Sequence, residues 1–321
     1  MRQRTLVFRP STSEYQASDF NEKERASMTK LGLDYSQNFQ EAKSADQVIL
    51  ITTSQIKTDE LKGYLKELEI KLIIHPNSGY DNFTKELVES FDSHIVIGNQ
   101  IRAAAVFQYT TSCLLDALGK IPFENGWDDK RLYSRNLKKK VTVYGRGHIG
   151  KKLEKFLIAS DMNFNFIDPY QEDKNSVGNH KIEETDIFIL LCSLNEKSYH
   201  ILGKNFFSNI KESSVIINPA RGKLIDETVL IEFLNKNKKS FAYLDVFENE
   251  PKDLSALSKE LKNNNALLSS HVAGVYDDID DAIIEFETKV ISDYLSGDIE
   301  GFKKVHEYAI LSNRLKDGIL I

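Results

Sequence analysis

Short apolar runs rich in β-branched residues alternate along the chain with longer segments of helical character. In the first third these runs are TLVFR (5–9), QVILIT (47–52), IKLIIH (70–75) and HIVIG (94–98). Strands separated by helix-length segments predict parallel βαβ units, because two parallel strands need a crossover connection. The other residues before position 46 are mostly polar and predict no further element.

The alternation restarts after residue 138 with six more runs. They are KVTVYG (140–145), NFNFID (163–168), DIFILLC (186–192), SVIIN (214–218), FAYLDV (241–246) and ALLSS (266–270). Six strands in one block are enough for a complete doubly wound parallel sheet. The sequence therefore predicts an α/β protein with two Rossmann-like lobes.

Two longer segments have the apolar spacing of helices and can connect the lobes. Apolar side chains recur at helical spacing in residues 103–120, and residues 279–297 show a similar pattern that ends at Gly297. If both segments cross between the lobes, the second lobe is inserted into the first. We accordingly predict one domain of residues 1–103 plus 296–321 and an inserted domain of residues 104–295.

The composition argues against several classes of partner. The 321 residues carry a net charge of −6 and show no basic footprint, so we expect no nucleic-acid partner. Cys113 and Cys192 lie in different segments without metal-ligand spacing, so we expect neither a disulfide nor a metal site. No apolar leader follows Met1 and no apolar run reaches the length of a membrane span, so we expect a soluble, cytoplasmic protein.

A glycine-rich turn follows the first strand of the second block. Gly145, Gly147 and Gly150 form the pattern GxGxxG, which alone is weak evidence because glycines are common in turns. Here a strand precedes the pattern, an amphipathic helix follows it, and a second strand ends in Asp168. In that context Gly145 makes a tight turn, Gly147 admits a diphosphate, and Gly150 lets the helix lie close to the strand.

Asp168 predicts which dinucleotide the turn binds. It lies 18 residues after Gly150 (168 − 150), where a carboxylate accepts hydrogen bonds from the adenosine ribose. Its negative charge would repel a 2′-phosphate, so we predict NAD rather than NADP, and residues 104–295 as the NAD-binding domain. Enzymes that use S-adenosylmethionine have a related strand, glycine turn and helix, and they are an alternative at this point.

Three polar residues, Arg221, Glu250 and His271, each follow one of the last three strands. Taken alone, each would more often be an ordinary surface or turn residue. Because the carboxyl ends of parallel strands line one crevice, we expect the three side chains to converge there. A histidine exchanges a proton near neutral pH, and an arginine presents a planar fork that matches a carboxylate.

With these motifs in order, the chain resembles the D-isomer-specific 2-hydroxyacid dehydrogenases over roughly residues 45–300. The motifs are NSGYDNF (77–83), GRGHIG with IDPY, INPARGKLID, LDVFENEP and SSHVAG. The resemblance implies a flavodoxin-like substrate (catalytic) domain of residues 1–103 plus 296–321. It also implies NAD-dependent hydride transfer between a small 2-oxo acid and a D-2-hydroxy acid, and a homodimer.

The resemblance also implies roles for individual residues. His271 would be the acid/base, Glu250 its partner, and Arg221 the group that binds the substrate carboxylate and carbonyl. The implied substrate-binding residues are Asn77, Ser78, Gly79 and Arg221. The implied cofactor-binding residues are Gly145, Arg146, Gly147, His148, Ile149, Gly150, Asp168, Cys192, Ser193, Ser198, Pro219, Ala220, Asp245 and Gly274.

The chemistry of the three polar residues suits that reaction. Reduction of a 2-oxo acid leaves an alkoxide that needs a proton, which an imidazolium at His271 can supply, and an ionised Glu250 would favour the imidazolium. Arg221 would orient the acid and polarise its carbonyl. A non-enzymatic NAD sensor of the same fold is the first alternative, and the presence of all three residues argues against it. A transferase would have no use for them.

A few positions depart from the family pattern. Val106-Phe107-Gln108 stands where Val-Ala-Glu is usual, Ser193 where proline is common, and Asp161 where glycine is usual. The departures leave Arg221, Glu250 and His271 intact. They bear instead on lobe closure and cofactor affinity.

For other residues two interpretations stay open. Arg102 either faces the cleft, where it would favour a second anionic group on the substrate, or is a solvent-facing cation near a helix start. Asp245 either faces the nicotinamide, as the resemblance implies, or caps a loop. Tyr80 and Trp127 serve either packing or recognition.

Overall fold

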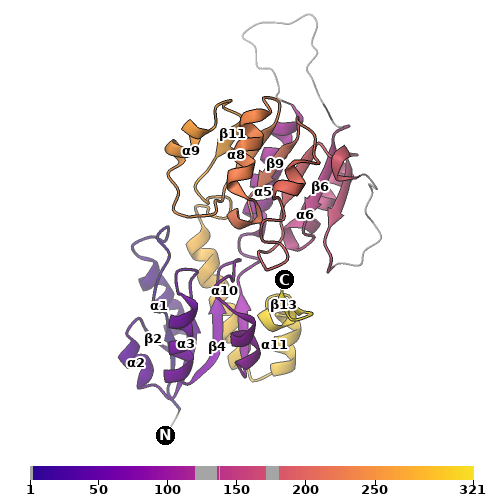
Figure 1. Cartoon of the computed structure of the whole chain (residues 1–321). Helices are drawn as coiled ribbons and strands as arrows, with labels where there is room; N and C mark the ends of the chain where they lie inside the picture. Colours follow the sequence, from indigo (N-terminus) through magenta and orange to yellow (C-terminus); the bar gives the residue numbers. More distant parts are fainter. Residues whose placement is uncertain (1–2, 120–135, 137, 171–180) are drawn as a thin grey trace, which may run out of the picture. The chain divides into compact units, whose positions relative to one another are not determined.

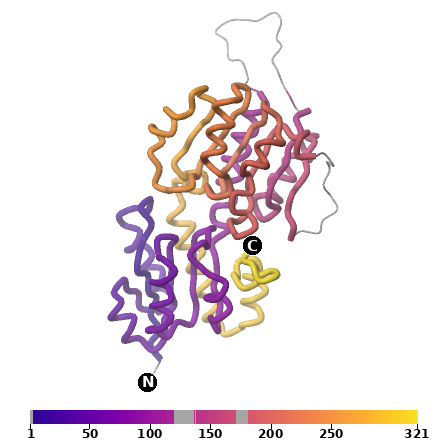
Figure 2. Tube along the Cα trace, in the orientation of Figure 1, coloured from indigo at the N-terminus to yellow at the C-terminus, as the bar shows by residue number. Residues whose placement is uncertain are grey.

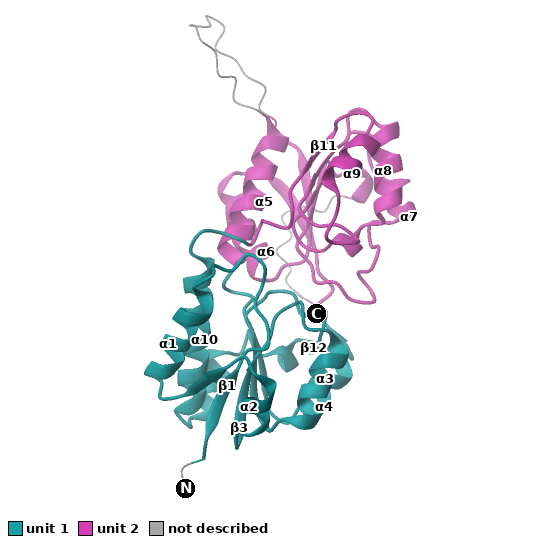
Figure 3. Cartoon of the chain, turned by 90° about the vertical axis from the view of Figure 1, so that its left-hand side faces the viewer, with its two compact units in different colours: residues 1–102, 275–321 teal, residues 103–274 magenta. Residues whose placement is uncertain are grey.

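The computed structural model describes residues 3–119, 136, 138–170 and 181–321, and Trp127 lies outside these residues. The chain forms two compact units, one of residues 1–102 with 275–321 and the other of residues 103–274 (Figure 3). We call them unit 1 and unit 2. Figure 2 follows the chain from the indigo N-terminal segment through unit 1, into unit 2 and back to the yellow C-terminal segment of unit 1.

Unit 1 is built on a five-stranded parallel sheet in the order β2-β1-β3-β4-β5. The strands are β1 (Thr5–Phe8), β2 (Asp34–Ser36), β3 (Gln47–Ile51), β4 (Ile70–His75) and β5 (His94–Ile97). This order, 2-1-3-4-5, is that of the flavodoxin-like fold. The fold class predicted for this part of the chain is confirmed.

Helices cover both faces of this sheet (Figure 1). One face carries α1 (Phe20–Lys30), α10 (Ile279–Leu295) and α11 (Ile299–Val305), and the other carries α2 (Phe39–Lys43), α3 (Thr58–Glu67) and α4 (Lys85–Ser90). In β3, Ile49 and Ile51 pack towards the first group of helices, and Val48 and Leu50 towards the second. Burial on both faces explains why these strands are continuously apolar rather than alternating.

Unit 2 is built on a six-stranded parallel sheet in the order β11-β10-β9-β8-β6-β7. The strands are β6 (Lys140–Tyr144), β7 (Asn163–Ile167), β8 (Ile187–Leu190), β9 (Val215–Asn218), β10 (Phe241–Leu244) and β11 (Ala266–Leu268). One face carries α5 (Ala103–Leu118) and α6 (His148–Ala159), and the other α7 (Lys204–Phe207), α8 (Glu227–Lys236) and α9 (Leu254–Glu260). All six predicted strands are present.

The direction of strand addition reverses at β6. From β6 the chain first forms β7 on one side and then β8 on the other. Ligands of open parallel sheets bind beyond the carboxyl ends of the strands at such a switch. The segments that follow β6 and β8 are therefore where a ligand of unit 2 is expected.

The second domain boundary differs from the expected one. The sequence places α10 in the inserted domain of residues 104–295, but Val290 and Ile291 of α10 are completely buried in the core of unit 1. The inserted unit ends at residue 274, which is 21 residues earlier than expected (295 − 274). Apolar spacing predicts that α10 is a helix but not which sheet it packs against.

The N-terminal part contains β2, α1 and α2, which the sequence analysis does not predict. Strand β2 has only three residues, of which Asp34 is exposed. Helix α1 buries a charged residue, Glu24, on the face that packs against the sheet. Both features weaken the apolar pattern on which the prediction depends.

The remaining elements are short. They are the 3₁₀ turns Ile182–Glu184, Gly222–Leu224 and Leu311–Arg314, and the antiparallel pair β12 (Leu315–Lys316) and β13 (Ile319–Leu320). Within the described ranges, none of the helices combines the length and the apolar character that crossing a membrane requires.

Candidate active site

The glycine turn after β6 has the geometry of a diphosphate loop. Gly145 has a φ of +96°, and a Cβ there would lie 2.6 Å from the backbone nitrogen of Cys192. A Cβ on Gly150 would lie 2.5 Å from the carbonyl oxygen of Gly145, whereas one on Gly147 would meet no protein atom within 4 Å. Packing therefore requires glycine at 145 and 150, and Gly147 leaves open space at the start of α6.

The start of α6 has the form of an anion site. Gly147 is the N-cap residue of this helix, and it has no side chain that could cap the first N–H groups. Such N–H groups, with the positive end of the helix dipole, bind phosphates. The residues present thus fit the diphosphate of a dinucleotide.

Asp168 lies immediately beyond β7 and beside the glycine turn. Its carboxylate accepts hydrogen bonds from the backbone N–H of Arg146 at 2.7 Å and of Tyr170 at 3.0 Å. These bonds fix the carboxylate at the carboxyl end of β7, where a ribose is expected in this fold.

The segment after β8 forms the other side of the switch point. Burial raises the pKa of the Cys192 thiol to about 12, so the thiol stays protonated at neutral pH. The Ser198 hydroxyl donates to the carbonyl oxygen of Ser193 and accepts from the N–H of Asn195, both at 2.8 Å. Ser198 thus closes the turn that contains Ser193.

Asn218, which sequence reasoning missed, shapes the loop that carries Arg221. Its side-chain amide donates to the carbonyl oxygen of Arg221 at 2.9 Å and accepts from the N–H of Ala220 at 3.1 Å, and these bonds span Pro219. The available signal was a polar residue that ends an otherwise apolar strand.

Gly222 brings the Arg221 loop against the loop of Glu250. A Cβ on Gly222 would lie 1.8 Å from the backbone carbon of Phe247, so the two segments approach more closely than any other residue would allow. The charge of Arg221 acts on Glu250 across this approach. The guanidinium also donates to the carbonyl oxygen of Ala220 at 2.7 Å.

Glu250 and His271 form the expected pair. Nδ1 of His271 lies 2.7 Å from Oε2 of Glu250, and the N–H of Phe247 donates to Oε1 at 2.9 Å. Burial alone would raise the pKa of Glu250, but the hydrogen bonds from His271 and Phe247 and the charges of His271 and Arg221 lower it. An ionised carboxylate only accepts, so Nδ1 carries the hydrogen and Nε2 is left for a substrate.

Asp245 holds the segment that carries His271. Its buried carboxylate accepts hydrogen bonds from the Ser269 hydroxyl at 2.6 Å and from the N–H groups of Val272 and Ala273, both at 2.9 Å. Its carbonyl oxygen accepts from the N–H of His271 at 2.7 Å. Asp245 therefore caps the loop, and its position facing the nicotinamide stays a prediction. His271 adopts a left-handed φ of +56° within this segment, and Gly274 ends the unit.

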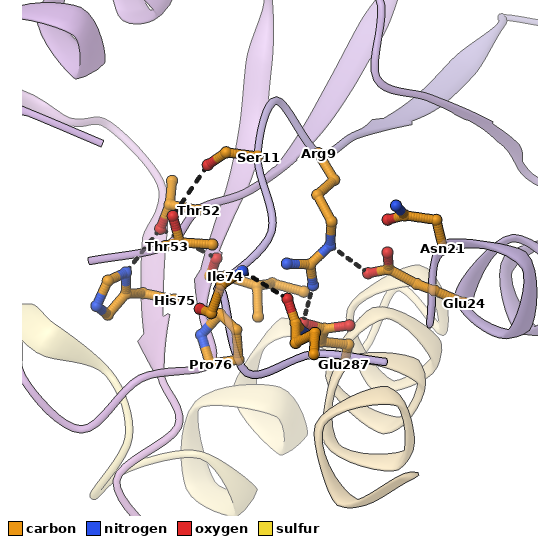
Figure 4. Close-up of polar contacts among 12 residues, drawn as sticks. Arg9, Ser11, Asn21, Glu24, Thr52, Thr53, Ile74, His75, Pro76 and Glu287 are labelled. Carbon is orange, nitrogen blue, oxygen red and sulfur yellow. Dashed lines mark hydrogen bonds and ion pairs between the residues drawn. The ribbon is translucent and has the colours of Figure 1, made fainter. Parts of the chain in front are cut away.

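The predicted substrate loop, Asn77-Ser78-Gly79, lies in unit 1 and is held from both ends. The buried His75 lies with Nε2 2.6 Å from the carbonyl oxygen of Gly79, and with Nδ1 2.8 Å from the Thr52 hydroxyl (Figure 4). The Asn77 amide donates to the Ser54 hydroxyl at 2.9 Å. His75 is a second residue that sequence reasoning missed, because a histidine that ends an apolar strand gives no local signal of its partner.

Arg102 and Tyr80 have partners that change their interpretation. Arg102 donates to the carbonyl oxygen of Pro76 at 2.7 Å and to the hydroxyl of Tyr15, and it is 9% exposed. It is therefore not a solvent-facing cation, and its bond to Pro76 holds the start of the 77–79 loop. Tyr80 is buried and donates to the carbonyl oxygen of Ile321, which is a packing role.

Comparison with known proteins agrees with this geometry. The model of the D-isomer-specific 2-hydroxyacid dehydrogenase NAD-binding domain matches residues 120–273. A glyoxylate/hydroxypyruvate reductase of Arabidopsis thaliana is 31% identical over 235 residues, which cover 67% of this chain and 70% of that protein. This chain belongs to the D-isomer-specific 2-hydroxyacid dehydrogenase family.

Other members of the family differ in length and cofactor. A D-3-phosphoglycerate dehydrogenase of Methanocaldococcus jannaschii is 30% identical over 68% of this chain, which spans only 44% of that relative's length. The solved structure of a D-lactate dehydrogenase of Aquifex aeolicus with NAD and lactic acid matches this chain with a TM-score of 0.73 at 20% sequence identity. The match covers 93% of this chain and 98% of that chain. An acyclic imino acid reductase, solved with NADPH, has a TM-score of 0.69 at 20% identity over 91% of this chain and 97% of the other. The match to the NAD-binding domain of the family supports a nicotinamide dinucleotide as the cofactor of this chain.

Proposed function

We propose that this 2-hydroxyacid dehydrogenase interconverts a small 2-oxo acid and a D-2-hydroxy acid with NAD(H). The observation that carries the proposal is the pair of His271 and Glu250, 2.7 Å apart, with the charge of Arg221 acting on the carboxylate. The printed names of the relatives support it, because they act on lactate, glyoxylate, hydroxypyruvate or phosphoglycerate. NAD is preferred over NADP because Asp168 places a negative charge beside the glycine turn.

In the proposed reaction His271, Glu250 and Arg221 have different roles. The nicotinamide supplies or accepts the hydride. In the direction of reduction, His271 gives its Nε2 proton to the substrate oxygen, and Glu250 keeps the ring oriented through Nδ1 and stabilises its positive charge before the transfer. Arg221 binds the substrate carboxylate, and its fixed charge favours a carbonyl oxygen on which negative charge develops. We also propose, from the family resemblance, that backbone N–H groups of residues 77–79 bind carboxylate oxygens.

The test is loss of NADH absorbance with a panel of 2-oxo acids. The panel contains glyoxylate, pyruvate, hydroxypyruvate, 2-oxoglutarate, branched-chain oxo acids and phosphohydroxypyruvate. We expect turnover on at least one of them, reduced by about 10²- to 10⁴-fold in His271→Ala, with the Kd for NADH changed by less than about 3-fold. Tight NADH binding without turnover on the whole panel would instead support the sensor alternative. Normal turnover in His271→Ala would refute the role of His271.

A further inference from the structure

The side chain of Arg146, inside the glycine turn, is held by Glu154 of α6. Its Nη2 lies 2.8 Å from Oε1 and 3.0 Å from Oε2 of Glu154, and its Nε lies 3.2 Å from Oε2. The two side chains are only 11% and 12% exposed. Such a two-pronged pair fixes the guanidinium in one orientation and neutralises its charge, unlike an exposed pair, which contributes little.

The same arginine is next to the position where a 2′-phosphate would lie. The backbone N–H of Arg146 donates to Asp168, the carboxylate that distinguishes NAD from NADP in this fold. The guanidinium carbon lies 5.9 Å from the ring centre of Phe166, two residues before Asp168 along an extended segment. Asp168 directly follows Ile167, the last residue of β7, so the cation lies against the end of the strand that leads to Asp168.

We propose that Glu154 is a second residue that sets the cofactor preference. An arginine at this place would bind a 2′-phosphate well, because its planar fork matches phosphate oxygens. Glu154 holds the fork away from such a role, so that a 2′-phosphate meets the charge of Asp168 while the Arg146 cation is paired with Glu154. The inference rests on the proposed dinucleotide cofactor, and it predicts that removal of Asp168 alone leaves NADPH binding incomplete.

The variants test what the Arg146 guanidinium does when Glu154 no longer carries a charge. We compare the wild type, Asp168→Ser, Glu154→Gln and the double variant. The change from Glu154 to Gln keeps the size of the side chain and one acceptor but removes the charge that holds the guanidinium. Asp161→Asn in the Asp168→Ser background is the matched control. It removes a carboxylate just beyond the other end of α6, and asparagine tolerates the left-handed φ of +52° there.

Binding, rather than turnover, is the readout. Isothermal titration gives the Kd for NADH and NADPH, and for ADP and 2′-phosphorylated AMP as fragments that lack the nicotinamide. We expect the double variant to bind NADPH about 10-fold more tightly than Asp168→Ser, and Asp161→Asn to change nothing beyond about 2-fold. The added change Arg146→Leu should abolish the gain, because it removes the cation.

Two outcomes would overturn the inference. If the double variant binds NADPH no better than Asp168→Ser while NADH binding is kept, Glu154 does not control the preference. If Glu154→Gln weakens NADH and NADPH equally, the pair only stabilises the turn. Neither outcome contradicts the proposed reaction. The proposed reaction is contradicted separately, if the wild type binds NADH but turns over no 2-oxo acid. If the wild type binds neither dinucleotide, the proposed cofactor fails, and the inference fails with it.

Discussion

Unit 1 and unit 2 each place an arginine with carboxylates at the carboxyl end of a parallel sheet, but in opposite surroundings. In unit 1 the guanidinium of Arg9, one residue beyond β1, binds Glu24 of α1 and Glu287 of α10 (Figure 4). All three side chains are completely buried. In unit 2, His271 and Glu250 are 53% and 32% exposed beside the loop of Arg221. The first cluster joins two helices to a sheet, whereas the second leaves His271 accessible.

The two clusters contain similar types of residue and differ in exposure. Exposure therefore distinguishes the structural cluster around Arg9 from the proposed catalytic cluster around His271. A buried ion pair must be satisfied within the protein, and Nε and Nη2 of Arg9 each find their partner in a helix of unit 1. The Tyr35 hydroxyl adds a bond of 2.6 Å to Glu24, and the Phe20 ring lies 5.1 Å from the guanidinium carbon of Arg9. Nε2 of His271, in contrast, has a partner only when a substrate is bound under the proposed function.

The largest effect is expected from removal of the buried cation. Arg9→Met leaves two carboxyl groups facing each other in the core, and we expect the free energy of unfolding to fall by about 3–5 kcal/mol. Urea unfolding followed by far-UV circular dichroism measures it. Arg4→Met is the matched control: Arg4 pairs with Asp34 on the surface, where the side chains are 45% and 58% exposed, and its loss should cost less than about 1 kcal/mol. Equal losses in the two variants would contradict the comparison.

The Arg9 cluster also marks the limit of what the sequence predicts. Arg9 and Glu287 are 278 positions apart, and nothing local to either residue indicates the other. The ten predicted strands and the glycine turn depend on short-range patterns, and the structure has each of them. Gly222, Asn218 and His75 act through contacts between loops, so their roles emerge only once the chain is folded.

The candidate site was predictable to the extent that its residues end strands. Arg221, Glu250 and His271 each follow a strand, and parallel strands bring their carboxyl ends to one edge. Unit membership of α10 was not predictable, because the apolar face of a helix fits any apolar sheet. The solvent-facing interpretation of Arg102 was wrong for a similar reason: its acceptors are a carbonyl oxygen and a hydroxyl from two distant segments.

A smaller effect, on activity rather than stability, is expected from Glu250→Gln. The imidazolium of His271 then loses the negative charge that faces it, so kcat for 2-oxo acid reduction should fall about 10- to 100-fold, and the alkaline limb of the pH profile should move to lower pH. The matched control is Glu248→Gln on the same loop, because Glu248 lies 2.6 Å from His200 instead. An unchanged pH profile in Glu250→Gln would separate Glu250 from the acid/base step.

Glu250 also makes a contribution to stability that depends on pH. The pKa of Glu250 is lowered in the fold, so its carboxylate contributes stability that is present above its unfolded pKa of about 4.3. That contribution is lost as the pH falls through the folded pKa. We therefore expect the wild type and Glu250→Gln to converge in unfolding free energy in acid.

The smallest effect is expected within the Arg9 cluster itself, where the two carboxyl groups should differ. Burial raises the pKa of Glu287, the nearby Glu24 adds to this, and Arg9 opposes it, so we predict that Glu287 is the carboxyl group that holds a proton. Gln is a close mimic of a protonated Glu, and Glu287→Gln should change the unfolding free energy by less than about 1 kcal/mol at neutral pH. Glu24→Gln should cost about 1–3 kcal/mol, because its amide N–H₂ would face the donors of Arg9 or Tyr35.

The pH dependence gives this prediction its sign. Because the pKa of Glu287 is raised in the fold, the stability that its protonated form provides is complete below the unfolded pKa of about 4.3 and is lost as the pH rises through the folded pKa. The wild type should therefore lose stability relative to Glu287→Gln on the alkaline side, as measured by urea unfolding at several pH values. If the unfolding free energy of the wild type instead rises relative to that of Glu287→Gln as the pH rises, Glu287 is ionised. The cluster would then carry two negative charges on one guanidinium, and its contrast with the exposed pair in unit 2 would rest on burial alone.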